Sequence, residues 1–382
     1  EGKVLIQPYA TKQKKFHYVS YLDNADFSED ISDFVCGHES HDKHNHDVEY
    51  IKEIIPTEVR GELRNGQPVD LRIFDLALAC TGEFAQVHGS TMGSVMAAFN
   101  TALNTVNEIF EREVAVRLQL IENNDQLIWL DPLTDPYFNA NQGGQLLGQN
   151  ADAINNTAGI PSSSYDLGHV FTGRCLDVGG VVSGLACTNG KDRGVTCHSS
   201  SNIIGVALRI MTHEIAHQFT AAHTWSNCPG ILEQLASGSA YEPGSGTTIM
   251  SYAGSCGNQN VQFGEDHYYH VRSLEQYMTF TREDNTTEGC ETIVPTSNNE
   301  PALSLNYENG FYVPISTPFE LTVEATDEEN DNLTYCWEQY NLGPLTDLGN
   351  PIGNSPTFRS FPPSSSPTRV FPRLGVLLQN ES

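Results

Sequence analysis

The sequence predicts a mixed α/β (α+β) domain with a twisted sheet, followed by a small all-β module. Two observations favour this fold class. Strand-like and helix-like apolar patterns follow one another from about residue 71 to residue 280, which is typical of helices layered on a mixed sheet. Beyond Cys290 the patterns are alternating and strand-like, and turn residues separate them.

The first part of the predicted domain has two strands around one long helix. Residues 71–80 change from alternation to a continuous apolar run, which indicates a strand. From 91 to 112 the apolar residues recur at spacings of three and four, which indicates an amphipathic helix. Residues 114–121 predict a second strand.

The second part contains shorter elements. After a long region rich in Asn, Asp and Gly, we expect three short strands, at 166–171, 180–186 and 194–197. Residues 203–219 carry an apolar stripe with helical period, and 271–280 predict a short closing helix. The stretch 224–262 between these helices is rich in Gly, Ser and Asn and is expected to be irregular.

The all-β module is predicted from residues 293–382. Residues 295–301 are typical of a linker, and an acidic turn at 327–332 separates two alternating strands, 319–325 and 333–340. A Pro/Ser-rich segment follows at 361–367, so this module could be incomplete.

The composition of the 382 residues excludes several classes of function. The formal net charge is −28, so phosphates would be repelled, which argues against nucleic acids and anionic membranes as main partners. No stretch of about 18 apolar residues exists, so no membrane span is expected. The chain begins at Glu1 without an apolar leader, so we expect that a signal peptide was removed or that the sequence begins late.

The nine cysteines indicate an oxidising compartment. They are scattered, and no Cys-x-x-Cys pair occurs, which weakens a structural zinc or thioredoxin-like interpretation. In an acidic, lysine-poor chain this usage is typical of a secreted, extracellular protein. Because nine is odd, at least one thiol lacks a partner within the chain.

The most informative segment runs from His213 to His223 and has the pattern HExxHxxxxxH. His213 and His217 lie one turn apart on one helix face, so both imidazoles can reach one Zn²⁺. His223 would lie about 15 Å further along a straight helix, so the chain must break near Thr220 and fold back. Three histidines leave one zinc position open for water, as a catalytic site requires.

Glu214 follows the first histidine, so its carboxylate lies beside the metal. There it can take a proton from a zinc-bound water and deliver it to the leaving amine. The pattern arises by chance in on the order of one chain in a thousand. The alternative is a buried helix with three incidental histidines.

These residues resemble those of metzincin zinc metallopeptidases, and most closely the bacterial reprolysin-like (adamalysin-like) branch. Residues 248–254 resemble the metzincin Met-turn, in which Met250 would form an apolar floor under the zinc ligands. Cys228 lies five residues after His223, as in the reprolysin pattern. The order of elements over about residues 70–290 also matches that family.

The resemblance implies a zincin catalytic domain at 67–292, with protein or peptide substrates and a monomeric state. It implies that an extended substrate pairs with an edge strand whose residues are Gly180, Val181, Val182, Ser183 and Gly184. Tyr252 corresponds to a tyrosine that stabilises the oxyanion in astacin-like and serralysin-like relatives. The alternative is a tyrosine packed under the loop.

Two residues depart from the family pattern. Thr220 stands where the family usually has Gly at the turn, and a β-branched residue at positive φ costs on the order of 1–3 kcal/mol. Either the turn has another geometry or neighbouring packing holds the strain. Thr224 replaces the Asp that is usual after the third histidine in snake-venom relatives.

Cys36 precedes Gly37 in residues 1–66, which the resemblance identifies as an inhibitory prosegment. In many metzincin zymogens a prosegment cysteine occupies the position of the water on the zinc, because a thiolate is a good ligand. This cysteine switch would make the protein a zymogen inhibited by its own prosegment. A disulfide to Cys80 and an idle thiol are the alternatives.

The resemblance also suggests the disulfides Cys187–Cys290 and Cys228–Cys256, which leaves Cys175–Cys197 as a local pair. Structural Ca²⁺ could be bound, as in some relatives. The module at 293–382 resembles immunoglobulin-like PKD or cadherin-like repeats of secreted bacterial enzymes.

Two other functions stay open on the sequence. One is a non-catalytic adhesin on a metzincin core, which Thr220 alone favours. The other is a zinc amidase acting on a non-protein polymer.

Overall fold

The computed structural model describes residues 4–10, 13–21, 36–37, 66–283, 285–304 and 311–379, and for 4–10 and 13–21 only the backbone. Most of the expected prosegment therefore lies outside the described residues. Strands β1 (Val4–Ala10) and β2 (Gln13–Tyr21) form an antiparallel pair. None of the described helices is long and apolar enough to cross a membrane.

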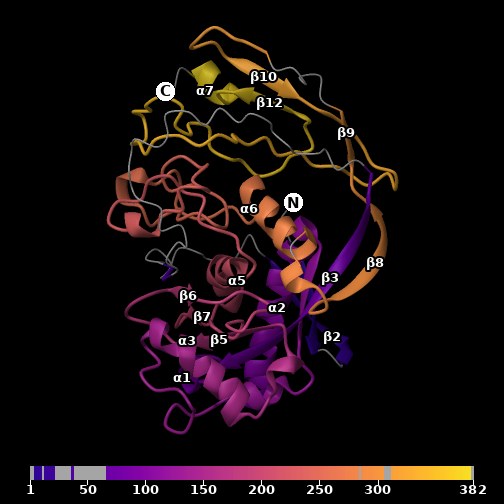
Figure 1. Cartoon of the computed structure of the whole chain (residues 1–382), viewed down its shortest axis with the longest axis vertical. Coiled ribbons are helices and arrows are strands. Elements are labelled where there is room, and N and C mark those ends of the chain that lie inside the picture. Colours follow the sequence, from indigo (N-terminus) through magenta and orange to yellow (C-terminus); the bar gives the residue numbers. More distant parts are fainter. Residues whose placement is uncertain are drawn as a thin grey trace.

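One mixed sheet organises residues 66–299 (Figure 1). Its order is β4-β3-β5-β7-β6, with strands Val116–Leu120, Pro68–Cys80, Leu167–Thr172, Gly194–Cys197 and Gly180–Val182. The first four strands are parallel, and β6 is antiparallel to β7 at the edge of this path. The fold class predicted for this part of the chain, a mixed α/β sheet, is confirmed.

A sixth strand joins the sheet where a linker was expected. Strand β8 (Thr292–Asn299) pairs antiparallel with the first half of β3. Arg72 pairs with both β4 and β8, and Leu76 with both β4 and β5, so β8 and β5 lie on the same side of β3. The linker prediction is wrong for 295–299, which belong to β8. The strand was missed because most of its residues are exposed and it has no apolar alternation.

Strand β3 separates two apolar layers because its side chains alternate. Phe74, Leu76 and Leu78 pack in the cluster that contains the long helix and the helix of the histidines. Ala77 and Ala79 pack in a second cluster on the other face. The sheet is therefore covered on both faces, and its central strand is buried.

Helix α2 (Met92–Val114) covers the first face, as the period-3.6 pattern predicts. It begins at Thr91 with a capping box, in which the Thr91 side chain accepts from Ser94 N and Ser94 Oγ accepts from Thr91 N. It ends at Ala115, which has a left-handed conformation.

The predicted helix at 203–219 is one helical run with a wider turn in its middle. Its three parts are α4 (Ile203–Val206), a π-turn (Ala207–Met211) and α5 (Thr212–Gln218). Helix α6 (Val271–Met278) follows the irregular loop, as expected, and a π-turn (Thr279–Glu283) extends it. Figure 1 shows α5 in the centre of the molecule, between the sheet and α6.

Two helices of this domain were not predicted. Helix α1 (Gly82–Val87) follows β3, and α3 (Gly143–Asp152) lies in the polar region before β5. Helix α3 buries only Gly143, Leu146 and Asn150, so it lacks an apolar stripe. The remaining turns of the domain are Asn124–Leu127, Ala153–Thr157, Ser162–Ser164, Leu232–Gln234, Gly257–Gln259 and Asn285–Thr287.

Three disulfides are present: Cys175–Cys197, Cys187–Cys290 and Cys228–Cys256. All three pairs agree with the sequence prediction. Cys36, Cys80 and Cys336 lie outside these three disulfides, and the alternative disulfide between Cys36 and Cys80 is not formed.

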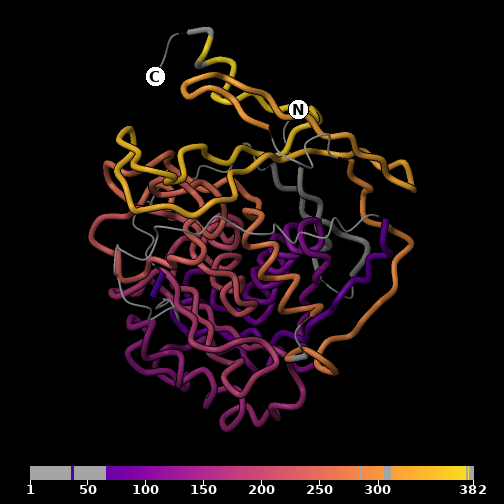
Figure 2. Tube along the Cα trace, turned by 45° about the horizontal axis from the view of Figure 1, so that its top comes forward, coloured from indigo at the N-terminus to yellow at the C-terminus, as the bar shows by residue number. Residues whose placement is uncertain are grey.

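The C-terminal segment forms small pieces of sheet in its described part. Strand β9 (Ala302–Ser304) pairs with β11 (Glu324–Thr326), and β10 (Phe319–Thr322) pairs with β12 (Thr368–Phe371). A short helix, α7, spans Leu374–Gln379. The strand expected at 333–340 is wrong, because only Tyr335 makes a bridge there, to Ser364. Figure 2 shows the segment crossing over the irregular loop before α6.

Candidate functional site

The three histidines of the motif converge where α5 ends. His213 and His217 lie one turn apart on α5, which stops at Gln218. Thr220 then adopts φ +72°, the left-handed conformation that turns the chain back and brings His223 beside the other two. The chain break expected near Thr220 is therefore present. All three imidazoles are buried, each at most 1% exposed.

Each of these rings is oriented by a backbone carbonyl. The Nδ1 atoms of His213, His217 and His223 lie 2.8, 2.7 and 3.0 Å from the carbonyl oxygens of Ile249, Ala221 and Gln234. A carbonyl oxygen only accepts, so each Nδ1 carries the proton and donates it. The Nε2 atom of each neutral ring therefore presents a lone pair, as metal-binding histidines do.

The three Nε2 atoms form a triangle with sides of 3.1, 3.2 and 3.3 Å. These contacts are not hydrogen bonds between neutral rings, because no Nε2 atom then has a proton to donate. Converging lone pairs repel unless a cation lies between them. Zinc bound tetrahedrally at 2.0–2.1 Å from each nitrogen requires nitrogens about 3.3 Å apart, so the triangle fits this ion.

Cys36 completes a four-residue group. Its Sγ atom and one ring nitrogen of each histidine all lie within 4.8 Å of one another. The backbone of Cys36 forms a parallel bridge with Gly180, and Gly37 N donates to the Gly180 carbonyl at 2.7 Å. The thiol also donates to Glu214 Oε2 at 3.4 Å. Cys36 is fully buried, so its thiol closes the site from the side of strand β6.

Glu214 points to the same place from α5. Its side chain is fully buried, and Oε1 has no hydrogen-bond partner among the described residues. Burial raises the pKa of Glu214 to about 8, while the hydrogen bond from Cys36 lowers it. A Cβ atom on Gly180 would lie 2.5 Å from Glu214 Oε1, so only glycine leaves room for this carboxylate.

Met250 and Tyr252 lie in a turn within the irregular loop at 224–262, and both are fully buried. Met250 O accepts from Thr224 N at 3.0 Å, which ties this turn to the residue after His223. The Tyr252 ring lies 4.7 Å from the His223 ring, and its hydroxyl donates to Gln234 Oε1 at 2.7 Å. The structure therefore brings Tyr252 to the histidines and also packs it under the loop.

The expected substrate-binding edge is only partly a strand. Gly180, Val181 and Val182 form β6, but the strand expected to reach residue 186 ends at Val182. The amide of Ser183 donates to Arg193 O, and Gly184 lies against Gly190, where a Cβ atom would be 1.8 Å from the Gly190 carbonyl oxygen. Ser183 and Gly184 therefore lie beyond the end of β6, with Ser183 exposed and Gly184 packed against Gly190.

Two residues of the site were missed by the sequence analysis. Gln234 holds His223 through its carbonyl and Tyr252 through its side chain. Glu242 is a buried carboxylate that accepts hydrogen bonds from Thr224, at the start of the irregular loop, and from Thr248, further along it. Neither residue lies in a periodic pattern, so no signal in the sequence marks them.

A family model described as Metallo-peptidase family M12B Reprolysin-like matches residues 71–277, which is more than half of the chain. No curated protein sequence matches the chain. One solved structure, described as a chaperone–substrate complex, is similar over 56% of this chain at 12% identity, with a TM-score of 0.31. The match covers 35% of that structure's chain.

Proposed function

Because the chain belongs to the reprolysin-like M12B family of metallopeptidases, we propose that it is a zinc endopeptidase kept latent by its own Cys36. The family implies a zinc-dependent hydrolase with protein or peptide substrates. The observation that carries the proposal is the triangle of three Nε2 atoms, 3.1 to 3.3 Å apart, beside a buried glutamate.

In this proposal His213, His217 and His223 hold the zinc ion. The carbonyls of Ile249, Ala221 and Gln234 keep the three rings in the tautomer that binds metal. When bound, zinc would polarise the attacking water and the scissile carbonyl and would stabilise the charge that develops on the carbonyl oxygen. Met250, which is fully buried, is the proposed Met-turn residue beneath these ligands.

Glu214 is the proposed general base and acid. Its carboxylate takes a proton from the attacking water and delivers it to the leaving amine. The support is its place on α5 between two zinc histidines and the oxygen Oε1, which has no hydrogen-bond partner in the described part of the chain. Tyr252, beside His223, is the proposed donor to the developing oxyanion.

Strand β6 is the proposed docking edge for substrates. An extended peptide would add to Gly180–Val182 through main-chain hydrogen bonds. The contact between Gly37 N and Gly180 O supports this, because the same edge already accepts a main-chain hydrogen bond from another segment. The short length of β6 restricts this pairing to the residues nearest the scissile bond.

Latency is proposed from the position of Cys36. Its sulfur takes the fourth place beside the three histidines, where the attacking water would otherwise lie. Its thiol also contacts Glu214, so one residue would block both the metal and the base.

The function is tested with the chain after proteolytic removal of residues 1–66. We expect cleavage of casein or gelatin that a chelator abolishes and added zinc restores. Glu214→Ala should lower the cleavage rate by about 10²- to 10⁴-fold and leave the zinc content unchanged. Zinc binding without cleavage of any protein would favour the adhesin, and cleavage of cell-wall amides alone would favour the amidase.

Latency is tested on the full chain with Cys36→Ala. We expect activity before any cleavage of the prosegment, since the fourth zinc position is then open. Cys336→Ala removes another free thiol, far in sequence from the motif, and serves as the control. If Cys36→Ala is as inactive as the parent until residues 1–66 are removed, the cysteine switch is rejected.

The other expectations need separate tests. Secretion, a monomeric state, a structural Ca²⁺ and an immunoglobulin-like C-terminal module are proposed only from the sequence and its resemblance. Fractionation of the producing cells, sedimentation, and unfolding with and without Ca²⁺ would test the first three.

A further inference from the structure

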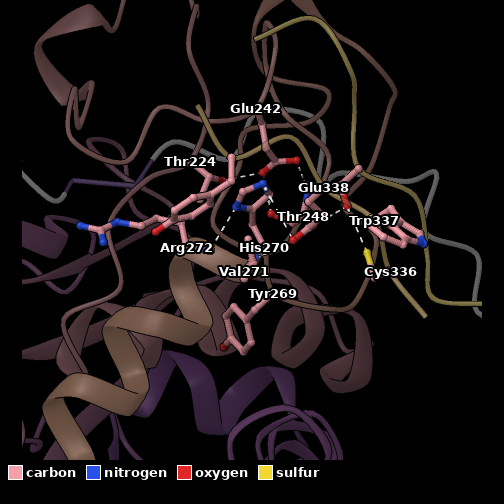
Figure 3. Close-up of polar contacts among 12 residues, drawn as sticks. Thr224, Glu242, Thr248, Tyr269, His270, Val271, Arg272, Cys336, Trp337 and Glu338 are labelled. Atoms are coloured by element: carbon pink, nitrogen blue, oxygen red, sulfur yellow. Dashed lines mark hydrogen bonds and ion pairs between the residues drawn. The ribbon is translucent and has the colours of Figure 1, made fainter. Parts of the chain in front are cut away.

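A single buried carboxylate, Glu242, closes the loop between the third histidine and Met250. Its side chain accepts five hydrogen bonds and is only 1% exposed. Oε2 accepts from the hydroxyls of Thr224 and Thr248, both at 2.6 Å. Oε1 accepts from Thr247 N at 2.8 Å, Thr247 Oγ1 at 3.1 Å and Thr248 N at 3.2 Å. Figure 3 shows Thr224 and Thr248 pointing at this carboxylate.

The donors to Glu242 lie next to two of the proposed zinc ligands. Thr224 follows His223, and Thr248 precedes Ile249, whose carbonyl accepts from His213 Nδ1. The backbone reinforces this connection, because Glu242 N donates to Thr224 O at 2.9 Å and Thr224 N donates to Met250 O at 3.0 Å. One side chain thus joins the segment that carries one histidine to the segment that orients another.

The charges around Glu242 show why the connection is firm. In the part of the chain that the structure describes, no Lys, Arg or His forms an ion pair with this carboxylate. A buried charge without a counterion is costly unless hydrogen bonds satisfy it. Hydrogen bonds to an ionised acceptor are short and roughly twice as strong as neutral ones. Moving Thr224 or Thr248 would therefore leave part of a buried charge unsatisfied.

We propose that Glu242 is a positioning residue of the zinc site, which fixes His223 and the carbonyl partner of His213 relative to each other. Both of its oxygens are occupied by threonine donors, so it does not bind the metal itself. This inference rests on the proposed function, since it concerns how the same site holds zinc. Its consequence is slower loss of zinc and a fixed arrangement of the three nitrogens.

The test compares Glu242→Ala and Glu242→Gln with the parent. We expect Glu242→Ala to lose zinc to a chelator about 10- to 100-fold faster, as other partners of metal ligands do when removed. The visible spectrum of the cobalt-substituted variant should also change, because it reports ligand geometry. Glu242→Gln keeps one carbonyl oxygen for the Thr247 and Thr248 amides, so its release rate should fall between those of Glu242→Ala and the parent.

Asp192→Asn is the matched control. Asp192 is also a buried carboxylate, and it accepts hydrogen bonds from Tyr165 and Asn155, which are not attached to the histidines. This variant should lower the melting temperature but keep the parent's zinc release and cobalt spectrum. If Glu242→Ala does not fold, Thr224→Val and Thr248→Val each remove one hydroxyl donor and should each speed up zinc release.

Three results would overturn the proposal. One is a Glu242→Ala protein that is less stable than the parent but releases zinc at the same rate with the same cobalt spectrum. Another is unchanged zinc release in both threonine variants. A parent chain that binds neither zinc nor cobalt would overturn the proposed function together with this inference, whereas the first two results would leave the proposed function intact.

Discussion

Residues 66–299 and residues 311–379 differ in how they are held together. The first region has one sheet with an apolar cluster on each face, and its polar site residues are buried inside it. Together with β9, which lies just before it, the second region forms two separate two-stranded sheets among the described residues, and most of its side chains are at least partly exposed. Four of its rings pack on one another, namely Phe311, Phe319, Phe358 and Phe371.

The second region is most buried where it touches the first. Glu338 accepts from Val271 N at 2.6 Å and from Ser360 Oγ at 2.5 Å (Figure 3). Tyr268 and Ser360 share a hydrogen bond of 2.6 Å, and Arg359 pairs with Asp266 at 3.1 Å. The first region is therefore held together by its own core, while the second is ordered largely by its contact with the first. Changes in the first region should therefore have the larger effects.

The largest effect is expected from the disulfide that closes the longest loop of the three in the first region. Cys187 and Cys290 are 103 residues apart, so in the chain-entropy model their bond stabilises the fold by about 5 kcal/mol. A Cys187→Ser, Cys290→Ser double variant should lose most of that free energy of unfolding in a denaturant titration. The pair Cys175–Cys197, 22 residues apart, should contribute less. Equal losses for the two pairs would contradict this order.

His169 should make the first region sensitive to acid. It is fully buried and contacts Thr196 and Gln218, and burial lowers its pKa to about 4. The unfolded chain binds this proton near pH 6.5, so stability is full above pH 6.5 and falls by roughly 3 kcal/mol as the pH drops to about 4. His169→Gln lacks this dependence, so its stability deficit should shrink on acidification. A deficit that is the same at pH 8 and pH 5 would refute the assignment.

Gly180→Ala tests how tightly the site is packed. The new methyl group would meet the Glu214 carboxylate at 2.5 Å, so the carboxylate must move. Displacing a catalytic group by about 1 Å can cost on the order of 100-fold in rate, and we expect kcat/KM of the processed enzyme to fall by that factor. Gly93→Ala is the matched control, because no atom lies within 4 Å of its added Cβ. Unchanged kcat/KM in Gly180→Ala would show that Glu214 has more room than the structure gives it.

Glu338→Ala should loosen the second region alone. The change removes the acceptor of Val271 N and of the hydroxyl of buried Ser360, and leaving a buried donor without its acceptor costs about 1–3 kcal/mol. We expect faster amide exchange around residues 336–361, with zinc content and the melting transition of the first region little changed. Glu320→Ala, at an exposed position of β10, should have no such effect. Faster exchange around α5 in Glu338→Ala would mean that the two regions are one cooperative unit.

The smallest effect is expected at the surface of the second region. Ile315 is 96% exposed, so Ile315→Ser should change the free energy of unfolding by less than about 0.5 kcal/mol. A larger loss in thermal unfolding would show that this part of the chain has a packing partner.

The sequence allowed the histidine site to be predicted because its chemistry is local. The three proposed ligands lie within eleven residues, two of them one turn apart on a helix with a clear apolar stripe and the third just beyond its end. The sheet of the first region was predictable for the same reason, since β3 and α2 have strong periods. Helix α3 and strand β8 were not, because few of their side chains are buried.

The supporting residues could not be predicted from local pattern. Glu242 and Gln234 lie in a loop without periodicity, and their partners are defined by how that loop folds back. Cys36 was singled out only by resemblance, since 178 residues separate it from Glu214, whose carboxylate it contacts. Contacts of this kind depend on tertiary packing, so no spacing of residues in the sequence predicts them.

Thr220 has a consequence for the order of folding. A glycine at φ +72° would let the turn between His217 and His223 form by itself, whereas threonine disfavours it. Helix α6 holds the turn in place, because Gln276 accepts from Thr220 Oγ1 through its carbonyl at 3.3 Å and from Ala222 N through its side chain at 3.1 Å. His223, the third proposed metal ligand, should therefore reach its position only after α6 has docked. Nascent chains that end before α6 would then capture zinc poorly, which delays the assembly of a working peptidase until the whole domain has been made.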